Sequence, residues 1–199
     1  MKNDEGYIKF QADWAKAEAL PRAFLSDLIE ARDRLHELGL IGVYPDGVGY
    51  GNISKRWDAE GRFAISGTAT GHLKNLGPEH FSLVAQVDIP SNRLRCQGPA
   101  LASSESMSHA AIYLQCPDIN AVIHVHDLGL WEKWIGKAPT TPESASYGSP
   151  EMAEAISELL ADPVGKAWKF LVMAGHREGC ISFGKDLEEA LKALLFLRG

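Results

Sequence analysis

The chain has 199 residues, a formal net charge of −6, and 45% hydrophobic and 23% charged residues. These values are ordinary for a globular protein with a core of its own, so we expect one domain over residues 1–199. The acidic balance argues against nucleic acid or an anionic membrane as the main partner, although backbone N–H groups can still bind an anion locally.

The sequence also indicates the cellular compartment of the protein. The N-terminal residues lack the apolar core of a signal peptide, and no apolar run approaches the roughly 20 residues that span a bilayer. The three cysteines, Cys96, Cys116 and Cys180, are odd in number and widely spaced, which argues against a disulfide framework. We therefore expect a cytoplasmic protein whose partners include neither nucleic acid nor a membrane.

The first half of the chain predicts one amphipathic helix followed mostly by strands. Apolar residues recur at helical spacing over residues 18–39, with Pro21 near the start and Gly39 as a stop signal. Short apolar segments predict strands at 40–44, 47–57, 62–66, 82–88 and 93–97. The polar, glycine-rich segment 67–77 is expected to be a loop.

The second half predicts three helices and further strands. Serines at the start of 103–116 suit a helix N-cap, and helices are also expected at 149–162 and 186–197. Strands are expected from residue 121 and at 169–176 and 180–184. Because helices and strands mix without a regular βαβ alternation, we predict an α/β sandwich with a largely antiparallel or mixed central sheet.

Two histidines follow the apolar residues 121–123. Side chains two residues apart on a strand point to the same face, so His124 and His126 should aim at one spot. A divalent metal such as zinc would account for the pair, because imidazole is a common metal ligand. Two surface histidines at a strand end are the alternative, and this spacing alone does not decide between them.

Glu105 follows two serines at the expected start of a helix. The helix dipole and the first backbone N–H groups favour a carboxylate or a bound phosphate there, although similar sequences begin many ordinary helices. His109 lies one turn later on a mostly apolar stripe. We interpret it as a core histidine or a support for a ligand rather than as a ligand.

Further candidates come from three other segments. His176 follows an apolar strand and could be a third metal ligand, and Glu178 would face the same side if the backbone is extended. The segments "GYGNIS" and "SGTATG" supply Asn52 and the hydroxyl groups of Thr68 and Thr70 for an anion. Neither segment matches the Walker or dinucleotide fingerprint, and each could be a plain turn.

Several motifs occur together in the order typical of one family. They are "GNIS", "SGTATG", "SSES" followed by "HAAIY", "INAVIHVH" and "ISFGKDLEEAL". From about residue 20 to its end the chain resembles the class II aldolase/adducin family. The resemblance implies a zinc-dependent, three-layer α-β-α sandwich, commonly a homotetramer with active sites at subunit interfaces, that acts on a small sugar phosphate.

The resemblance also implies roles for individual residues. His124 and His126 match the paired metal ligands of the family, and Glu105 matches the acid/base glutamate of its aldolases. The residues that match the substrate-phosphate site are Gly51, Asn52, Thr70, Gly71, Ser103 and Ser104, with Thr68 as a neighbour. Another divalent metal could replace zinc, because imidazole sites discriminate poorly among such ions.

The chain departs from the family pattern in three places. Where relatives have a His-Gly pair it reads "GHREG", so the third ligand is Glu178 in an ungapped alignment and His176 with a two-residue insertion. We predict His176, because three neutral imidazoles make the usual aldolase site. The proton-donating tyrosine of relatives aligns with Ser144, three residues before Tyr147, and the sequence stops at Gly199 without the tail of several relatives.

The predicted function is a metal-dependent aldolase-type lyase that cleaves or forms a C–C bond in a small sugar phosphate. The metal would polarise the carbonyl group, and Glu105 would move a proton at the neighbouring carbon. A glutamate here favours aldolase or dehydratase over epimerase, whose usual residue is aspartate. An epimerase or dehydratase of the same family is the first alternative, and a non-catalytic interaction module resembling the adducin head is the second.

Overall fold

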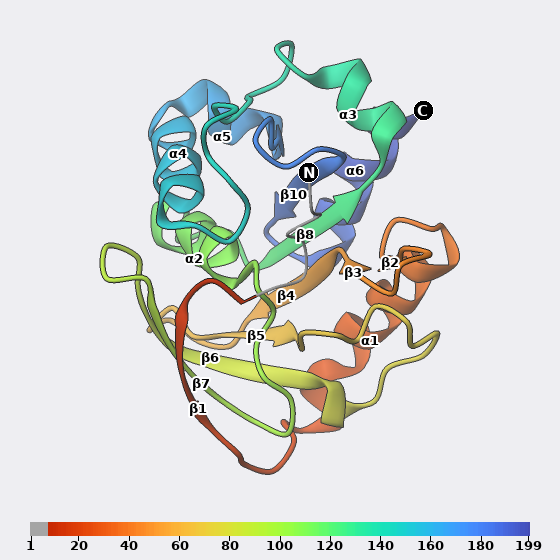
Figure 1. The fold of residues 1–199 in the computed structure, drawn as a ribbon, viewed down its shortest axis with the longest axis vertical. Helices are drawn as coiled ribbons and strands as arrows, with labels where there is room; N and C mark the ends of the chain where they lie inside the picture. Colours follow the sequence, from red (N-terminus) through yellow and green to blue (C-terminus); the bar gives the residue numbers. More distant parts are fainter. Residues whose placement is uncertain (1–7) are drawn as a thin grey trace.

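An eight-stranded sheet forms the centre of the computed structural model, which describes residues 8–199 (Figure 1). Its strand order is β1-β7-β6-β5-β4-β8-β10-β9. Neighbouring strands pair antiparallel, except that β1 and β7 are parallel. The strands are β1 Gln11–Ala15, β4 Asn52–Arg56, β5 Phe63–Ser66, β6 Phe81–Asp88, β7 Arg93–Gln97, β8 Ala121–His126, β9 Phe170–Val172 and β10 Gly179–Gly184. A separate hairpin consists of β2 Gly42–Val43 and β3 Gly49–Tyr50.

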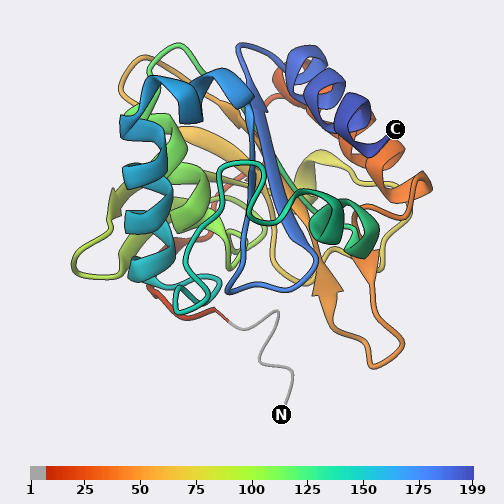
Figure 2. The same cartoon turned by 90° about the horizontal axis from the view of Figure 1, so that it is seen from above.

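Helices cover both faces of the sheet, as Figure 2 shows from above. On one face lie α2 Ser106–Gln115 and α4 Pro150–Ala161, and α5 Pro163–Trp168 follows α4 beside the edge strand β9. On the other lie α1 Arg22–Glu37, α3 Leu128–Trp134 and α6 Leu187–Arg198. A short 3-10 turn, Pro78–His80, precedes β6. The predicted α/β sandwich with a largely antiparallel, mixed sheet is therefore confirmed.

Three short elements lie outside the sequence prediction. β1 is a mostly exposed edge strand whose sequence does not alternate between apolar and polar residues. Its local sequence therefore does not predict that it pairs with β7. The helices α3 and α5 are only 7 and 6 residues long, and each begins after an aspartate whose side chain caps it. The predicted strands at 40–44 and 169–176 are shorter in the structure, because turns take up their remaining residues.

β8 is an interior strand, and it carries two of the predicted ligands. All six of its residues are buried between β4 and β10. Ala121, Ile123 and Val125 belong to the core beneath α1 and α6. Val122 belongs to the opposite core, beneath α2 and α4. Alternation therefore puts His124 and His126 on the α2 side of the sheet.

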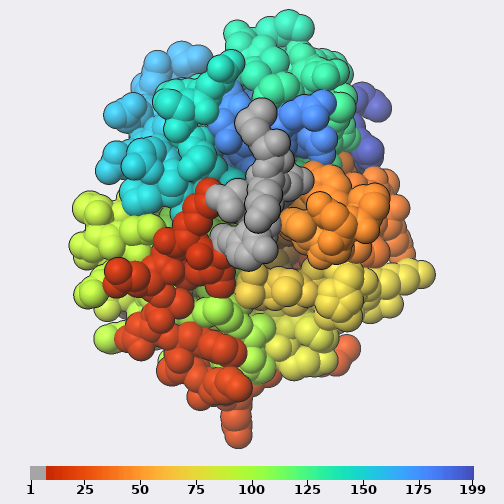
Figure 3. Space-filling view, in the orientation of Figure 1, coloured from red at the N-terminus to blue at the C-terminus, as the bar shows by residue number. Residues whose placement is uncertain are grey.

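The loop between β5 and the 3-10 turn packs against the β2–β3 hairpin. A Cβ atom on Gly71 would lie 2.1 Å from the carbonyl oxygen of Gly42, so only glycine allows this approach. Figure 3 shows the two segments side by side, in orange and yellow, on the face that it presents. This contact holds two of the predicted phosphate-binding segments against each other.

The three cysteines are free and buried, in agreement with the expectation of no disulfide. Within residues 8–199, none of the helices combines the length and apolar character that a membrane crossing requires.

Arg32 on α1 holds the loop between β5 and the 3-10 turn in place. Its guanidinium group is only 1% exposed and donates hydrogen bonds to the backbone oxygens of Thr70 at 3.0 Å and Lys74 at 3.1 Å. Asp33 provides a partial counter-charge at 3.3 Å. Burial lowers the pKa of Arg32, and Asp33 opposes that effect. The guanidinium group thus fixes the loop that holds Thr70 and Gly71.

We expect Arg32→Ala to lower the free energy of unfolding by about 2–4 kcal/mol, because the carbonyl groups of Thr70 and Lys74 lose charge-assisted hydrogen bonds from a buried guanidinium group. Urea denaturation measures the change. Arg95→Ala is the matched control, because Arg95 and Asp13 form an exposed ion pair and its loss should cost about 0.5 kcal/mol or less. Equal stability of the two variants would contradict this role for Arg32.

Candidate active site

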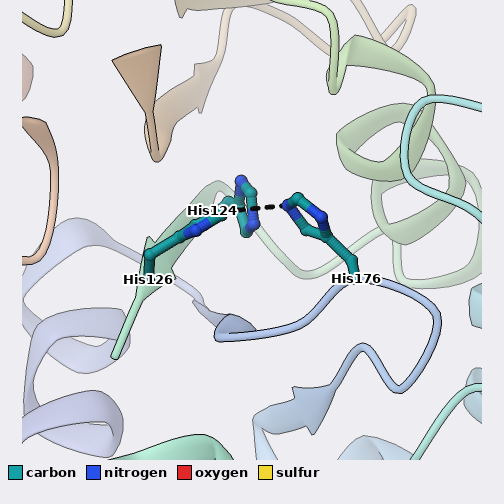
Figure 4. Close-up of side chains that lie close together, drawn as sticks. All are labelled: His124, His126 and His176. Atoms are coloured by element: carbon teal, nitrogen blue, oxygen red, sulfur yellow. Dashed lines mark hydrogen bonds between the residues drawn. The ribbon is translucent and has the colours of Figure 1, made fainter. Parts of the chain in front are cut away.

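Three histidines from two parts of the chain converge near the end of β8 (Figure 4). His124 and His126 come from β8, and His176 comes from the turn between β9 and β10. All three are buried, and one ring nitrogen of each lies within 4.8 Å of those of the other two. The Nε2 atoms of His126 and His176 are 2.9 Å apart. The structure thus brings together the three residues that the sequence predicts as metal ligands.

Burial keeps these imidazoles neutral. It lowers the pKa of His176 to about 3, with a further lowering from the charge of Lys9. The pKa values of His124 and His126 lie well below 6.5, first because of burial and then because of neighbouring histidines. Neutral imidazole carries the lone pair that binds a metal, so the cluster presents nitrogen donors at neutral pH.

The cluster fits a divalent metal ion. Nε2 of His124 is buried and has no hydrogen-bond partner within the described part of the chain. An unpaired buried nitrogen costs free energy unless something binds it. Two ligand nitrogens at a tetrahedral zinc ion lie about 3.3 Å apart, close to the observed separation of His126 and His176. Three protein ligands and one open position are also the usual arrangement of a catalytic zinc site.

Glu105 lies at the N-cap of α2, because the helix begins one or two residues later than expected. The prediction that Ser103 or Ser104 caps this helix is wrong, because these serines form the preceding turn and Ser103 accepts the backbone N–H of Ser106 through its carbonyl oxygen. The Oε2 atom of Glu105 accepts a hydrogen bond from Ser108 at 2.9 Å, whereas Oε1 has no partner among residues 8–199. This arrangement leaves one carboxylate oxygen available.

The carboxyl group of Glu105 is suited to proton transfer. Burial raises its pKa to about 7, and the hydrogen bond from Ser108 and the charge of Lys9 lower it by smaller amounts. A carboxyl group that titrates near neutral pH can both take up and release a proton under working conditions.

One pocket joins the cluster to the predicted phosphate site. The pocket has a volume of about 330 Å³ and is bordered by Glu105, His124 and His176. Its lining includes all the residues predicted to bind phosphate: Gly51, Asn52, Thr68, Thr70, Gly71, Ser103 and Ser104. The amide nitrogen of Asn52 also lies 3.3 Å from Nδ1 of His124, so Asn52 supports a histidine as well as lining the pocket.

Glu178 contacts the cluster indirectly. The backbone around it is not extended, because Glu178 adopts a left-handed conformation with φ of 72° at the end of the His176 turn. Its Oε2 accepts a hydrogen bond from the Tyr44 hydroxyl at 2.7 Å, and that hydroxyl lies 2.8 Å from Nδ1 of His126. The geometry therefore favours His176 over Glu178 as the third ligand.

Three residues near the cluster were missed or left open by the sequence. Tyr147 is buried in the pocket lining with its ring centre 5.0 Å from that of His176, whereas Ser144 is exposed. The Nζ atom of Lys9 lies 3.9 Å from the centre of the Tyr147 ring. No local sequence motif marks Lys9 or Tyr44 as a site residue. The only sequence signal for Tyr147 is its position three residues after Ser144, which aligns with the proton-donating tyrosine of relatives.

His109 is part of the core, as interpreted from its apolar stripe. It is fully buried, and its Nδ1 atom lies 2.7 Å from the hydroxyl oxygen of Ser54 on β4. Burial lowers its pKa to about 3. His109 therefore joins α2 to the sheet in its neutral form.

The comparisons with known proteins agree with the geometry. Residues 26–198 match the family described as Class II Aldolase and Adducin N-terminal domain. Because this match covers most of the chain, the protein belongs to the class II aldolase/adducin family. No curated protein matches the chain significantly.

Solved structures of sugar-phosphate aldolases share the fold. An L-fuculose 1-phosphate aldolase has 18% sequence identity and a TM-score of 0.67, with 90% of this chain and 84% of that chain covered. The L-fuculose-1-phosphate aldolase of Thermus thermophilus has 19% identity and a TM-score of 0.63, with coverages of 89% and 90%. A sugar-phosphate aldolase of Thermotoga maritima has 18% identity and a TM-score of 0.67, with coverages of 88% and 90%. At these identities the likeness establishes the fold.

The raised pKa of Glu105 predicts a pH-dependent difference in stability between wild type and Glu105→Gln. In metal-free wild type, the folded state keeps the proton up to about pH 7, whereas the unfolded chain releases it near pH 4.5. The stability contributed by protonation is therefore present below pH 4.5 and is lost as pH rises through 7.

Glu105→Gln should accordingly match wild type near pH 4.5 and become more stable by about 3 kcal/mol above pH 7. Urea denaturation of the two chelator-treated proteins across this pH range measures the difference in their free energies of unfolding. Both proteins contain the same histidines, so the contributions of the histidines cancel. A difference that stays constant with pH would show that burial does not shift this carboxyl group.

Proposed function

We propose that the protein is an aldolase-type lyase that depends on a divalent metal, with zinc as the expected ion. Its substrate would be a small ketose phosphate, cleaved to dihydroxyacetone phosphate or a similar fragment and an aldehyde. The observation that carries the proposal is the placement of the histidine cluster and Glu105 at one pocket. Membership of the family and the sugar-phosphate aldolases among the structural neighbours support it.

In this proposal His124, His126 and His176 hold the ion. A bound ion supplies Lewis-acid chemistry at the substrate carbonyl group. Neutral imidazoles suit that task because, unlike a carboxylate ligand, they do not cancel part of the ion's charge.

Glu105 and Tyr147 provide the proton transfers. In the condensation direction, Glu105 removes a proton from the carbon beside the carbonyl group, and that carbon forms the new bond to the aldehyde carbon. Tyr147 then donates its hydroxyl proton to the aldehyde oxygen, which becomes the product hydroxyl group, and solvent returns the proton held by Glu105 to the Tyr147 phenolate. Cleavage reverses these steps. Ser108 holds Oε2 of Glu105, so Oε1 is the atom that takes or returns the proton.

The phosphate group is assigned to the opposite part of the pocket. Ser103 and Ser104 precede the N-terminus of α2, where backbone N–H groups and the helix dipole favour an anion. Asn52, Thr68 and Thr70 add amide and hydroxyl groups from the facing loops. The proposal also includes a homotetramer, which the resemblance to the family implies, and a cytoplasmic location, which the three free cysteines favour.

A retro-aldol assay on pentulose and hexulose phosphates tests the reaction class. Release of dihydroxyacetone phosphate or glycolaldehyde phosphate together with an aldehyde would support the proposal. An isomerised or dehydrated product without fragments would instead indicate an epimerase or dehydratase. A protein that takes up no divalent ion under any condition would favour the interaction module.

We expect His124→Ala, His126→Ala and His176→Ala each to lose most of their metal, because each removes one of three ligands. Glu178→Gln is the contrasting variant and should retain metal at saturating concentration, because residue 178 lies outside the cluster and a glutamine oxygen can still accept the Tyr44 hydroxyl proton. Elemental analysis of the purified proteins measures metal content, and circular dichroism checks their fold. Metal loss in Glu178→Gln with full retention in His176→Ala would reverse the ligand assignment.

Glu105→Gln should keep metal and fold and lower turnover by about 10²–10⁴-fold, because glutamine preserves size and cannot exchange the proton. Steady-state cleavage rates, normalised to bound metal, provide the measurement. Ser157→Ala is a suitable control, because this hydroxyl donates a hydrogen bond to the Ala153 carbonyl oxygen within α4. A near-normal rate for Glu105→Gln would assign the proton transfer to another group.

A further inference from the structure

The side of His126 that faces away from His176 is held by two residues. The hydroxyl group of Tyr44 donates its one proton to Oε2 of Glu178 at 2.7 Å. The same oxygen lies 2.8 Å from Nδ1 of His126. Because a phenol has a single proton, which here goes to the carboxylate, the ring must donate Nδ1–H to Tyr44. His126 therefore keeps its lone pair on Nε2, the nitrogen that faces His176.

The backbone brings Glu178 to this position at a conformational cost. Its φ of 72° lies in the left-handed region, which L-residues other than asparagine and aspartate rarely adopt. The next residue, Gly179, pairs with His126 across β10 and β8, and the carbonyl oxygen of Glu178 accepts the backbone N–H of Asp127. The carboxylate is thus fixed beside the end of the strand that carries His126.

Tyr44 is fixed from the other direction by the β2–β3 hairpin. Its backbone N–H donates to the carbonyl oxygen of Val48 at 2.8 Å, which closes the turn. Its ring packs against that of Tyr50, with centroids 4.5 Å apart. Val48 and Gly49 of the same hairpin line the substrate pocket. One hairpin therefore provides both a wall of the pocket and the hydroxyl group that contacts His126.

We propose that Tyr44 and Glu178 are positioning residues that set the tautomer and ring orientation of His126 for metal binding. This inference rests on the proposed metal site. Nδ1–H of His126 donates to the Tyr44 hydroxyl, which in turn donates to the Glu178 carboxylate. This chain of hydrogen bonds makes Nε2 of His126 a better electron-pair donor to the metal, as a carboxylate does behind other metal-binding histidines. Metal affinity consequently depends on two residues that do not touch the ion.

The test compares Tyr44→Phe and Glu178→Asn with Tyr50→Phe. Tyr50→Phe removes a hydroxyl group from the same hairpin, but that group contacts the Gly39 carbonyl oxygen rather than His126. Asparagine tolerates the left-handed backbone and is too short to replace the carboxylate, so Glu178→Asn should keep the thermal stability of wild type. Chelator competition measures zinc affinity, and nitrogen NMR of the metal-free proteins reports the tautomer of His126.

We expect Tyr44→Phe and Glu178→Asn to weaken zinc binding by about 10–100-fold, and Tyr50→Phe to leave it close to wild type. Metal-free wild type should show His126 protonated on Nδ1, and Tyr44→Phe should lose that preference. A wild-type zinc affinity in Tyr44→Phe, or an equal loss of zinc affinity in Tyr50→Phe, would overturn the positioning role of Tyr44 and Glu178 and leave the proposed metal site intact. Failure of the wild type to bind zinc would overturn the metal site and this inference together.

Discussion

The constraint on which the rest of the site depends is the burial of two histidines at the end of an interior strand. β8 is paired on both edges, and the side chains of His124 and His126 are only 1% and 5% exposed. Each buried ring nitrogen then needs a partner. Asn52 lies at one nitrogen of His124 and Tyr44 at one nitrogen of His126. The remaining nitrogens face the interior, where His176 completes a cluster suited to a cation.

The same burial has opposite effects on the two kinds of titratable group. It raises the pKa of Glu105 to about 7 and lowers that of His176 to about 3. A poorly solvated pocket disfavours the charged form of each, so the carboxyl group can exchange protons near neutral pH while the imidazoles stay neutral. One physical cause therefore prepares a candidate acid/base and a candidate ligand set within one pocket.

Local patterns predicted the parts of the structure that depend on local physics. Alternation along β8 put His124 and His126 on one face, and helical spacing gave α1, α4 and α6. Sequence could not predict the contact between Tyr44 and Glu178, because the residues are 134 positions apart and meet only when the hairpin folds over the strand ends. The left-handed turn at Glu178 was also hidden, since glutamate gives no signal for positive φ.

We propose that the three imidazoles share one divalent ion. Anomalous X-ray diffraction at the absorption edge of the metal, on crystals of protein purified without chelator, tests it most directly. We expect one strong anomalous peak about 2.0–2.1 Å from a ring nitrogen of each of His124, His126 and His176. An ion bound through the carboxylate of Glu178, or a fully occupied ion elsewhere with these histidines uncoordinated, would contradict it.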